Sequence, residues 1–465
     1  MFGCAPTVRL GCGTTCSRRA VHMGRMSKNS KLGVQVVVDH AENKTSVESI
    51  VEAAQELLSK RYGGRQELLE VEQLNGSGTA IVLRARVAPS PFLQQRSVVL
   101  KYIPPTGRLI DESTLMREVV SYQFTTSLSE EVRPGPVLLA YDVDEHILVI
   151  SDSGDGDTFA DLLDSSNADL RIEILRNLGE AIGKLHVGTA SKEQDFDILL
   201  HRMLTKHPEI TEMHDFRERL LRMYIEVGIK LIEQQGIVIP EVVKEFADNA
   251  RRRLTSGQHR AFTPFDLSPD NIIVSDKTHF LDYEWAGFRD AAFDVACVVA
   301  GFPQFLFARP VMDDEADIFI DSWAQQVAGM WPNVRNLSRL HARILTALVG
   351  WAFSSVAMMH MGYDNEAFED LYQGMVSDGA ESMNVDAIVS RLTTSGNTLL
   401  HDIFHISDEE DEENAVFDED REALVLIRRD LYETFEALYR FARRESDSRF
   451  PVVADFAGKL VEKLD

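Results

Sequence analysis

The sequence contains little cysteine, and its few cysteines are poorly placed for cross-linking. Only four occur in 465 residues, and three of them (Cys4, Cys12 and Cys16) lie near the N-terminus. No partner ligands stand at zinc-like spacing, and Cys297 is alone in an apolar run. A disulfide framework is therefore excluded, and a reducing, cytoplasmic location is the expectation.

Basic residues are also scarce. Lys and Arg total 48 against 74 Asp and Glu, which gives a formal charge of −26. Such a chain lacks the positive surface that a general nucleic-acid binder or a protein attached to anionic lipid requires. Residues 1–38 are the exception, since they contain Lys and Arg but no acidic residue. They form either a plain basic extension or an organelle-targeting peptide.

Only one long stretch lacks charge. Residues 344–363 contain no Asp, Glu, Lys or Arg, and twenty such residues are long enough to span a membrane. Thr346, Ser354 and His360 dilute this stretch, and no second candidate accompanies it. A buried core helix is therefore predicted, and no membrane span.

Motifs of several large enzyme classes are absent. The chain has no G-x-x-x-x-G-K-[ST] phosphate loop, no G-x-S-x-G elbow and no G-x-G-x-x-G between a strand and a helix. P-loop, serine-hydrolase and dinucleotide-binding chemistries are thereby disfavoured.

The most informative segment that is present covers residues 264–294. Asp266 is followed five residues later by Asn271, then by a short apolar run, a turn at 275–277, and a second apolar run that ends in Asp282. This pattern predicts a loop and a hairpin that bring Asn271 and Asp282 together. Carboxylate and amide oxygens so placed suit Mg²⁺, which prefers hard oxygen ligands and retains nucleotide phosphates as further ligands.

These residues resemble the aminoglycoside phosphotransferase and choline kinase family, whose loops read H-G-D-x-x-P-x-N and D-[FWY]-E. The resemblance covers about residues 65–360 and implies an α+β, bilobal protein-kinase-like fold. The small lobe would contain an antiparallel sheet and a helix, and the large lobe would be mostly helical. The matching positions are Asp266, Pro269, Asn271, Asp282, Glu284 and Asp294.

The resemblance also implies roles for these side chains. Asp266 would orient or deprotonate the acceptor hydroxyl, and Asn271 and Asp282 would bind Mg²⁺. Glu284 would bind a second Mg²⁺ or a polar group of the substrate, the alternative being a solvent-exposed carboxylate. Asp294 would brace the catalytic loop.

The nucleotide would bind against the preceding segments. Lys101 ends an apolar strand, and Glu118 lies on the following helix, so by resemblance the two form an ion pair that faces the phosphates. A glycine-bearing turn would cover the phosphates, although a plain hairpin turn is an equal alternative. The hinge backbone would contact the base. The residues assigned to the turn and the hinge are Gly76, Ser77, Gly78, Ile150 and Asp152.

One position departs from the family pattern. Pro264 and Phe265 stand where the family has His and Gly. This change puts the loop geometry in doubt, so a catalytically weak pseudokinase that serves as a binding or regulatory module is the alternative function.

The chain divides into five predicted parts. An acidic run suggests a loop before the C-terminal helices, with a basic partner protein as an alternative role. The parts are a basic extension (1–38), a small lobe with a leading helix (39–151), a large helical lobe (152–400), an acidic loop (401–422) and C-terminal helices (423–465).

The predicted function is that of a transferase. It would use ATP or GTP with Mg²⁺ to phosphorylate a hydroxyl of a small molecule, and the acidic composition favours a cationic or amino-bearing acceptor.

Overall fold

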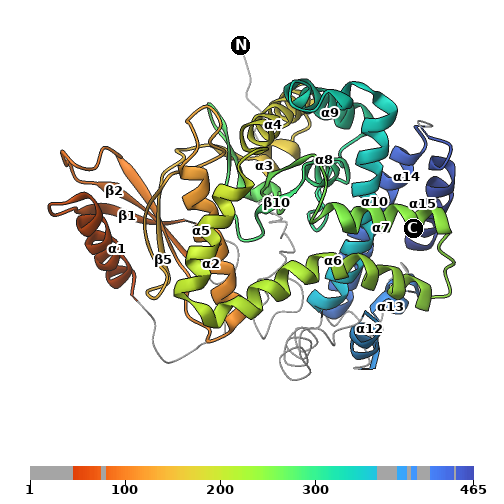
Figure 1. Ribbon diagram of the computed structural model, residues 1–465, viewed down its shortest axis with the longest axis horizontal. Helices are drawn as coiled ribbons and strands as arrows, with labels where there is room; N and C mark the ends of the chain where they lie inside the picture. Colours follow the sequence, from red (N-terminus) through yellow and green to blue (C-terminus); the bar gives the residue numbers. More distant parts are fainter. Residues whose placement is uncertain (1–45, 75–79, 364–384, 395–398, 406–418, 445–446) are drawn as a thin grey trace, which may run out of the picture.

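The computed structural model describes residues 46–74, 80–363, 385–394, 399–405, 419–444 and 447–465. The chain forms a small lobe and a larger helical lobe, on the left and right of Figure 1. The small lobe consists of α1 (Val47–Tyr62), β1 (Leu68–Leu74), β2 (Ile81–Val87), β3 (Ser97–Tyr102), α2 (Leu109–Thr126), β4 (Leu138–Asp142) and β5 (Ile147–Ser151).

The five strands form one antiparallel sheet in the order β1-β2-β3-β5-β4. Alternating side chains of β3 pack on opposite sides of the sheet. Val98 and Leu100 belong to a core shared with α1, whose N-terminus is capped by the hydroxyl of Ser46. Lys101 of β3 is therefore directed to the other face, where α2 lies.

The large lobe begins with β6 (Asp157–Thr158) and is built mainly from helices. Its N-terminal helical part contains α3 (Phe159–Leu163), α4 (Ala168–Thr189), α5 (Glu193–Lys206), η1 (Pro208–Ile210), α6 (Thr211–Gln234) and α7 (Glu241–Arg253). Two small sheets include the next strands, since β7 pairs with β10, and the β8–β9 hairpin pairs with β6. The elements of this segment are β7 (Arg260–Thr263), η2 (Pro269–Asn271), β8 (Ile272–Val274), β9 (Thr278–Phe280) and β10 (Gly287–Asp290). The remaining elements are α8 (Ala292–Val299), α9 (Asp313–Val327), η3 (Pro332–Arg335), α10 (Leu337–Tyr363), α12 (Val385–Thr394), α13 (Leu399–His405), α14 (Glu419–Ala442) and α15 (Phe450–Leu464).

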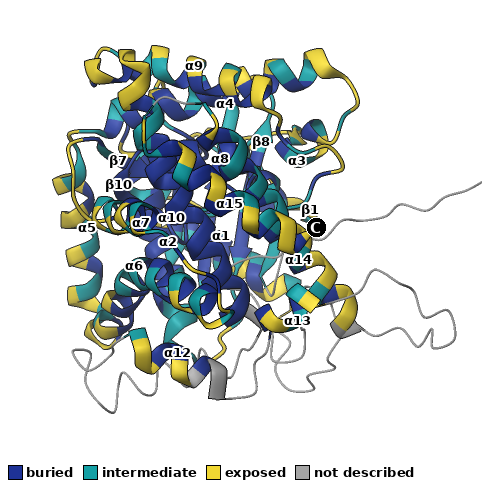
Figure 2. Ribbon diagram, turned by 90° about the vertical axis from the view of Figure 1, so that its right-hand side faces the viewer, coloured by how far each residue is buried: buried dark blue, intermediate teal, exposed yellow. Residues whose placement is uncertain are grey.

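The centre of the large lobe is formed by α10. Within the described residues, α10 is the one helix long and apolar enough to cross a membrane, over Leu337–Met361, and the apolar part of this stretch is buried inside the protein. Figure 2 shows the dark blue interior around α10 and α8. The contact of α10 with α6 is close, since a Cβ added at Gly228 would lie 1.9 Å from the carbonyl oxygen of Phe353. The burial agrees with the predicted core helix.

The acidic segment differs in part from the prediction of a loop over 401–422. Residues 401–405 belong to α13 and residues 419–422 to α14, while 406–418 lie outside the described residues. The buried side chains of Leu400 and Ile403 explain why the helical structure extends into this segment. The predicted α+β bilobal arrangement of an antiparallel sheet and a mostly helical lobe is confirmed.

Candidate active site

The Lys101 side chain joins the two lobes. Its Nζ donates to Glu118 Oε1 at 2.6 Å and to Asp282 Oδ1 at 3.0 Å. Glu118 lies on α2, and Asp282 follows the β8–β9 hairpin of the large lobe. Lys101 is 9% exposed and Glu118 is 1% exposed, so the ion pair is largely shielded from water. The nucleotide-binding role of these two residues remains a prediction.

The β8–β9 hairpin brings the predicted metal ligands to one end. Ile272 pairs with Phe280, and the Leu281 backbone N–H donates to the Asn271 carbonyl at 2.9 Å. Asn271 therefore lies beside the residue that precedes Asp282. The side-chain Nδ2 of Asn271 is buried without a hydrogen-bond partner, which leaves the amide free to turn its oxygen toward a cation.

The chain turns sharply at Asp282, which has a φ of 60°. This left-handed conformation is uncommon outside glycine, and such outliers collect at functional sites. Tyr122 of α2 contacts this turn, because its hydroxyl hydrogen-bonds with the Asp282 backbone and its ring lies 4.9 Å from that of Tyr283 in a T-shaped arrangement. Sequence reasoning did not identify Tyr122 as part of the candidate site.

Asp266 lies in a tight loop after β7. Its backbone N–H donates to the Pro264 carbonyl at 2.8 Å, and its Oδ1 accepts the Ser268 N–H at 3.3 Å. The carboxylate borders a cavity of about 20 Å³, which is also lined by Ser268, Cys297 and Gln304. This volume suits about one water molecule. Burial raises the pKa of the Cys297 thiol well above its usual value, so this cysteine is neutral at physiological pH.

The departure from the family loop has a structural account. Phe265 adopts a φ of 66°, a conformation that glycine accepts without strain and a bulky side chain does not. Its ring stacks on Trp351 with centroids 5.1 Å apart, and the Arg289 guanidinium carbon lies 4.6 Å from its centroid. Packing on both sides therefore holds Phe265 in the position where the family has glycine.

Asp294 lies at the end of a buried hydrogen-bond relay. Trp323 Nε1 donates to His186 Nδ1 at 3.0 Å, and His186 Nε2 lies 3.0 Å from Asp294 Oδ2. Because indole N–H is only a donor, His186 must accept at Nδ1 and donate from Nε2 to the carboxylate. Asp294 and His186 are both fully buried. This geometry suits the predicted supporting role of Asp294.

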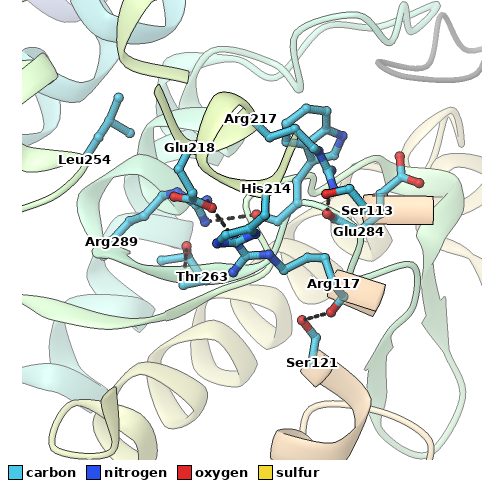
Figure 3. A network of polar contacts seen from close by, with 12 residues as sticks. Ser113, Arg117, Ser121, His214, Arg217, Glu218, Leu254, Thr263, Glu284 and Arg289 are labelled. Atoms are coloured by element: carbon cyan, nitrogen blue, oxygen red, sulfur yellow. Dashed lines mark hydrogen bonds and ion pairs between the residues drawn. The ribbon is translucent and has the colours of Figure 1, made fainter. Parts of the chain in front are cut away.

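A second polar network joins α2, α6 and β10, as Figure 3 shows. Arg117 of α2 and Arg289 of β10 both approach Glu218 of α6, with Nη2–Oε1 distances of 2.5 and 3.4 Å. Burial alone would raise the pKa of Glu218, but the two arginine charges outweigh it and lower the pKa to about 2. Glu218 therefore remains ionised and ties the small-lobe helix to the strand that follows the metal loop.

Glu284 takes part in the same region. Its backbone carbonyl accepts from Arg217 Nη2 at 2.9 Å, and Arg217 also lies over the Trp285 ring, 4.3 Å from the centroid. Glu284 is only 4% exposed, so the alternative of a solvent-exposed carboxylate is wrong. Its burial beside a cation follows from the packing of α6 on this loop, and its predicted metal role remains a prediction.

The hinge connects β5 to β6. Ile150 is buried in β5, whereas the carboxylate of Asp152 accepts from Arg84 Nη2 at 3.2 Å and from the Ser97 hydroxyl at 2.8 Å. Arg84 also donates to Asp155 at 2.7 Å. These contacts attach the first hinge residues to the sheet. The predicted phosphate turn, Gly76 to Gly78, lies outside the described residues.

The side chains fit a magnesium ion that is completed by phosphate oxygens. Within the described residues no three His, Cys, Asp or Glu side chains gather as a metal site. Asn271 and Asp282 would supply two oxygen donors at the hairpin end, and Mg²⁺ commonly takes only one or two protein carboxylates together with substrate phosphates. Such a site is incomplete without nucleotide.

The comparisons with known proteins concern the fold. No family model matches the chain, and no curated protein matches it. Solved structures do match, so the predicted resemblance to choline kinases and antibiotic phosphotransferases is confirmed as structural similarity at low identity.

Three matched structures illustrate the range. A choline kinase from Cryptosporidium parvum Iowa II is 14% identical, with 72% of this chain and 97% of that chain covered and a TM-score of 0.41. A macrolide 2'-phosphotransferase from Brachybacterium faecium is 14% identical, with 74% and 97% covered and a TM-score of 0.40. An ADP-bound aminoglycoside phosphotransferase, APH(2'')-Ib, is 13% identical, with 72% and 96% covered and a TM-score of 0.36. At these values the similarity assigns no substrate and no activity to this chain.

Proposed function

We propose that this protein is a Mg²⁺-dependent phosphotransferase that uses ATP or GTP to phosphorylate a hydroxyl of a small molecule. The observation that carries the proposal is the double contact of Lys101 with Glu118 and Asp282. It places a cation from the small lobe next to a carboxylate that follows the hairpin holding Asn271. A nucleotide phosphate between the lobes would meet both groups.

The side chains supply positioning and charge, which is most of what phosphoryl transfer needs from a protein. Lys101, held by Glu118, would bind phosphate oxygens. Asp266 would orient the acceptor hydroxyl and take its proton. The bond between the γ-phosphorus and the bridging oxygen breaks, an oxygen–phosphorus bond forms at the acceptor, and the nucleoside diphosphate leaves with the electron pair. A magnesium ion bound by Asn271 and Asp282 would offset the phosphate charge.

The acceptor class is proposed from charge. The chain has a formal charge of −26, and the carboxylates of Asp266 and Asp270 lie on the loop where an acceptor would bind. Both favour a cationic or amino-bearing alcohol over an anionic one.

A pseudokinase is the second candidate. Phe265 replaces the family glycine at a φ of 66°, and Asp282 is already neutralised by Lys101 in this structure. A protein that binds nucleotide without transferring phosphate would be consistent with both observations.

Thermal unfolding with nucleotide and Mg²⁺, against nucleotide with chelator, tests the site. A ligand at a hundred times its dissociation constant stabilises a fold by about 2.7 kcal/mol, so the melting temperature should rise by several degrees. We expect Asp282→Ala to abolish the Mg²⁺-dependent shift. Asp276→Ala, at the exposed tip of the same hairpin, is the matched control and should keep it.

Turnover then separates the two candidates. In a screen of amino-bearing alcohols, Asp266→Asn should keep the thermal shift and lose about a hundredfold or more in turnover. A thermal shift without turnover on any acceptor would favour the pseudokinase. No Mg²⁺-dependent shift in the well-folded protein would refute both forms of nucleotide binding proposed here.

A further inference from the structure

A separate pocket in the large lobe carries an unusual charge. The cavity has a volume of about 320 Å³ and lies among α7, η3, α10 and the start of α15. Figure 1 shows α7, α10 and α15 in the part of the large lobe far from the sheet. The polar side chains that line it include Arg253, His259, Asn333, Arg339, Arg343 and Arg449.

Four arginines around one cavity stand out in a chain with a formal charge of −26. A buried carboxylate offsets part of this charge, because Asp290 Oδ2 lies 2.8 Å from Arg253 Nη1 and 3.4 Å from Arg343 Nη1. Arg449 pairs with Asp447 at 2.8 Å. Arg339 is exposed and makes no ion pair within the described parts of the chain. The pocket therefore retains a positive excess.

Donor groups in the pocket also remain unsatisfied. Arg343 Nη1 is buried and, despite the nearby Asp290, makes no hydrogen bond. Such a group normally finds a partner, because an unmade buried hydrogen bond costs about 1–3 kcal/mol.

The neighbouring histidine adds a second open position. His259 is 4% exposed and stacks on Trp331 with centroids 4.8 Å apart, while its Nδ1 has no hydrogen-bond partner. Burial first, and then the charge of Arg343, lower the pKa of His259 to about 4, so the ring is neutral at physiological pH. The His259 ring and the arginines line the same pocket, and a polar, negatively charged ligand there would satisfy their open hydrogen-bond positions and offset the positive charge.

We propose that this pocket is a binding site for a small multivalent oxyanion, such as a phosphate ester or a polycarboxylate. Guanidinium groups bind phosphate and carboxylate oxygens through paired hydrogen bonds, which a single point charge cannot do. The volume lies at the low end of the range for small-molecule pockets, so the ligand is a small molecule and not a polymer. The site is distinct from the proposed nucleotide site, whose residues do not line it.

One strand pair connects the pocket to the loop of Asp266. His259 directly precedes β7, and Asp290 ends β10, where the two strands pair. The Ala291 backbone N–H donates to the His259 carbonyl at 2.9 Å. The opposite end of the same ribbon leads into the loop of Asp266. A ligand in the pocket would therefore order the far end of the ribbon that supports the catalytic loop.

The full chain is titrated with inorganic phosphate or with citrate in a buffer that does not itself bind arginine. Calorimetry measures the binding, and thermal unfolding measures the stabilisation. Chloride at matched ionic strength is the reference. Arg339→Glu is the main variant, because its side chain is exposed and its loss should leave the fold intact. Arg335→Glu, four residues earlier on η3, is exposed, lies outside the pocket lining and changes the net charge equally.

We expect saturable binding of at least one oxyanion. Arg339→Glu should weaken this binding about tenfold or more, which is the effect of losing one hydrogen bond between charged groups, and Arg335→Glu should leave it unchanged. The phosphate and citrate arms identify which oxyanion is preferred. Lys101→Met should leave this binding intact, so failure of the proposed kinase function would not affect it. Equal anion effects in both arginine variants, or binding that disappears in Lys101→Met, would overturn the proposal.

Discussion

At the scale of single residues, the candidate site depends on charges that neutralise one another across the two lobes. Lys101 contacts two carboxylates, and one of them, Glu118, is 1% exposed. A buried carboxylate that loses its cation is strongly destabilising, whereas the intact pair contributes little net stability. The main effect of the ion pair is therefore to fix the position of the Lys101 side chain and not to stabilise the fold.

A double-mutant cycle on this pair gives a measurable expectation. Lys101→Met should lower the free energy of unfolding by about 3 kcal/mol, because it leaves Glu118 buried without its cation. Glu118→Gln in the same chain should recover part of that loss. Urea denaturation of the four proteins measures the coupling.

The exposed pair of Arg86 and Glu70 provides a control. Its atoms lie 2.7 Å apart, but the side chains are 47% and 69% exposed. A coupling of about 1 kcal/mol or less is expected there. Additive effects at Lys101 and Glu118 would show that the buried pair does not act as a unit.

The Lys101–Glu118 pair was predicted by resemblance to the kinase-like family, and the β8–β9 hairpin was predicted from a short local pattern. Lys101 ends an apolar strand, and Asn271 and Asp282 flank two strands with a tight turn between them. Sequence reasoning could not predict the conformation of Phe265, because the positive φ depends on stacking with Trp351, which lies 86 positions later in the sequence. The contact of Tyr122 with the metal loop was missed for the same reason.

At the scale of elements, α14 holds the segment that follows α8. The backbone N–H of Gln304 donates to Asp430 Oδ1 at 2.6 Å, and Arg429 Nη2 donates to the Phe307 carbonyl at 3.1 Å. Gln304 has a φ of 75° and borders the small cavity at Asp266. A C-terminal helix outside the family resemblance therefore fixes one wall of the candidate site.

The buried side chain of Asp430 makes stability depend on pH. Burial raises the pKa of Asp430 to about 8, and its Oδ2 has no hydrogen-bond partner. Since the folded state binds this proton more tightly than the unfolded state, the stabilising contribution is complete below about pH 4 and is lost as the pH rises toward 8. Asp430→Asn stays neutral and keeps the acceptor oxygen for Gln304.

The difference in free energy of unfolding between Asp430→Asn and the natural protein should therefore grow in favour of the variant from pH 5 to 8, by up to about 1.4 kcal/mol per pH unit. Urea unfolding at several pH values measures the difference. Parallel stability curves for the two proteins would contradict the shifted pKa.

Ile427, Leu431 and Phe435 recur every four residues along one face of α14, and all three are buried. The sequence could not identify the partner. Asp430 and Gln304 are separated by 126 positions, and their contact depends on how α10 and α14 pack. Contacts of this range follow from the assembled core and not from local periodicity.

At the scale of the whole molecule, the described residues form two hydrophobic cores. One lies between α1 and the sheet, and the other combines α2 with the large lobe. The smaller core has fewer members and no buried aromatic side chain, so the sheet should be the less stable region in the absence of nucleotide.

The tryptophans allow this difference to be measured. All four, Trp285, Trp323, Trp331 and Trp351, lie in the large lobe, so their fluorescence reports on that lobe alone. Hydrogen exchange of peptides from β1 and β2 reports on the sheet. We expect these peptides to lose protection from exchange at a lower urea concentration than the midpoint of the tryptophan fluorescence transition. Mg²⁺ and nucleotide should reduce the difference between the two urea concentrations. Coincident transitions without ligand would show that the lobes unfold together.

The two lobes are joined in a way that constrains their relative motion. Past the hinge, Asp157 and Thr158 of β6 pair with Val274 and Ile273 of the β8–β9 hairpin. A Cβ at Gly156 would lie 2.7 Å from the Val274 carbonyl oxygen, so the contact requires glycine. A rotation between the lobes must therefore bend the chain at residues 152–156. Such a rotation would change the distance from Lys101 to Asp282, whereas the spacing between the end of the hinge and the β8–β9 hairpin would stay constant.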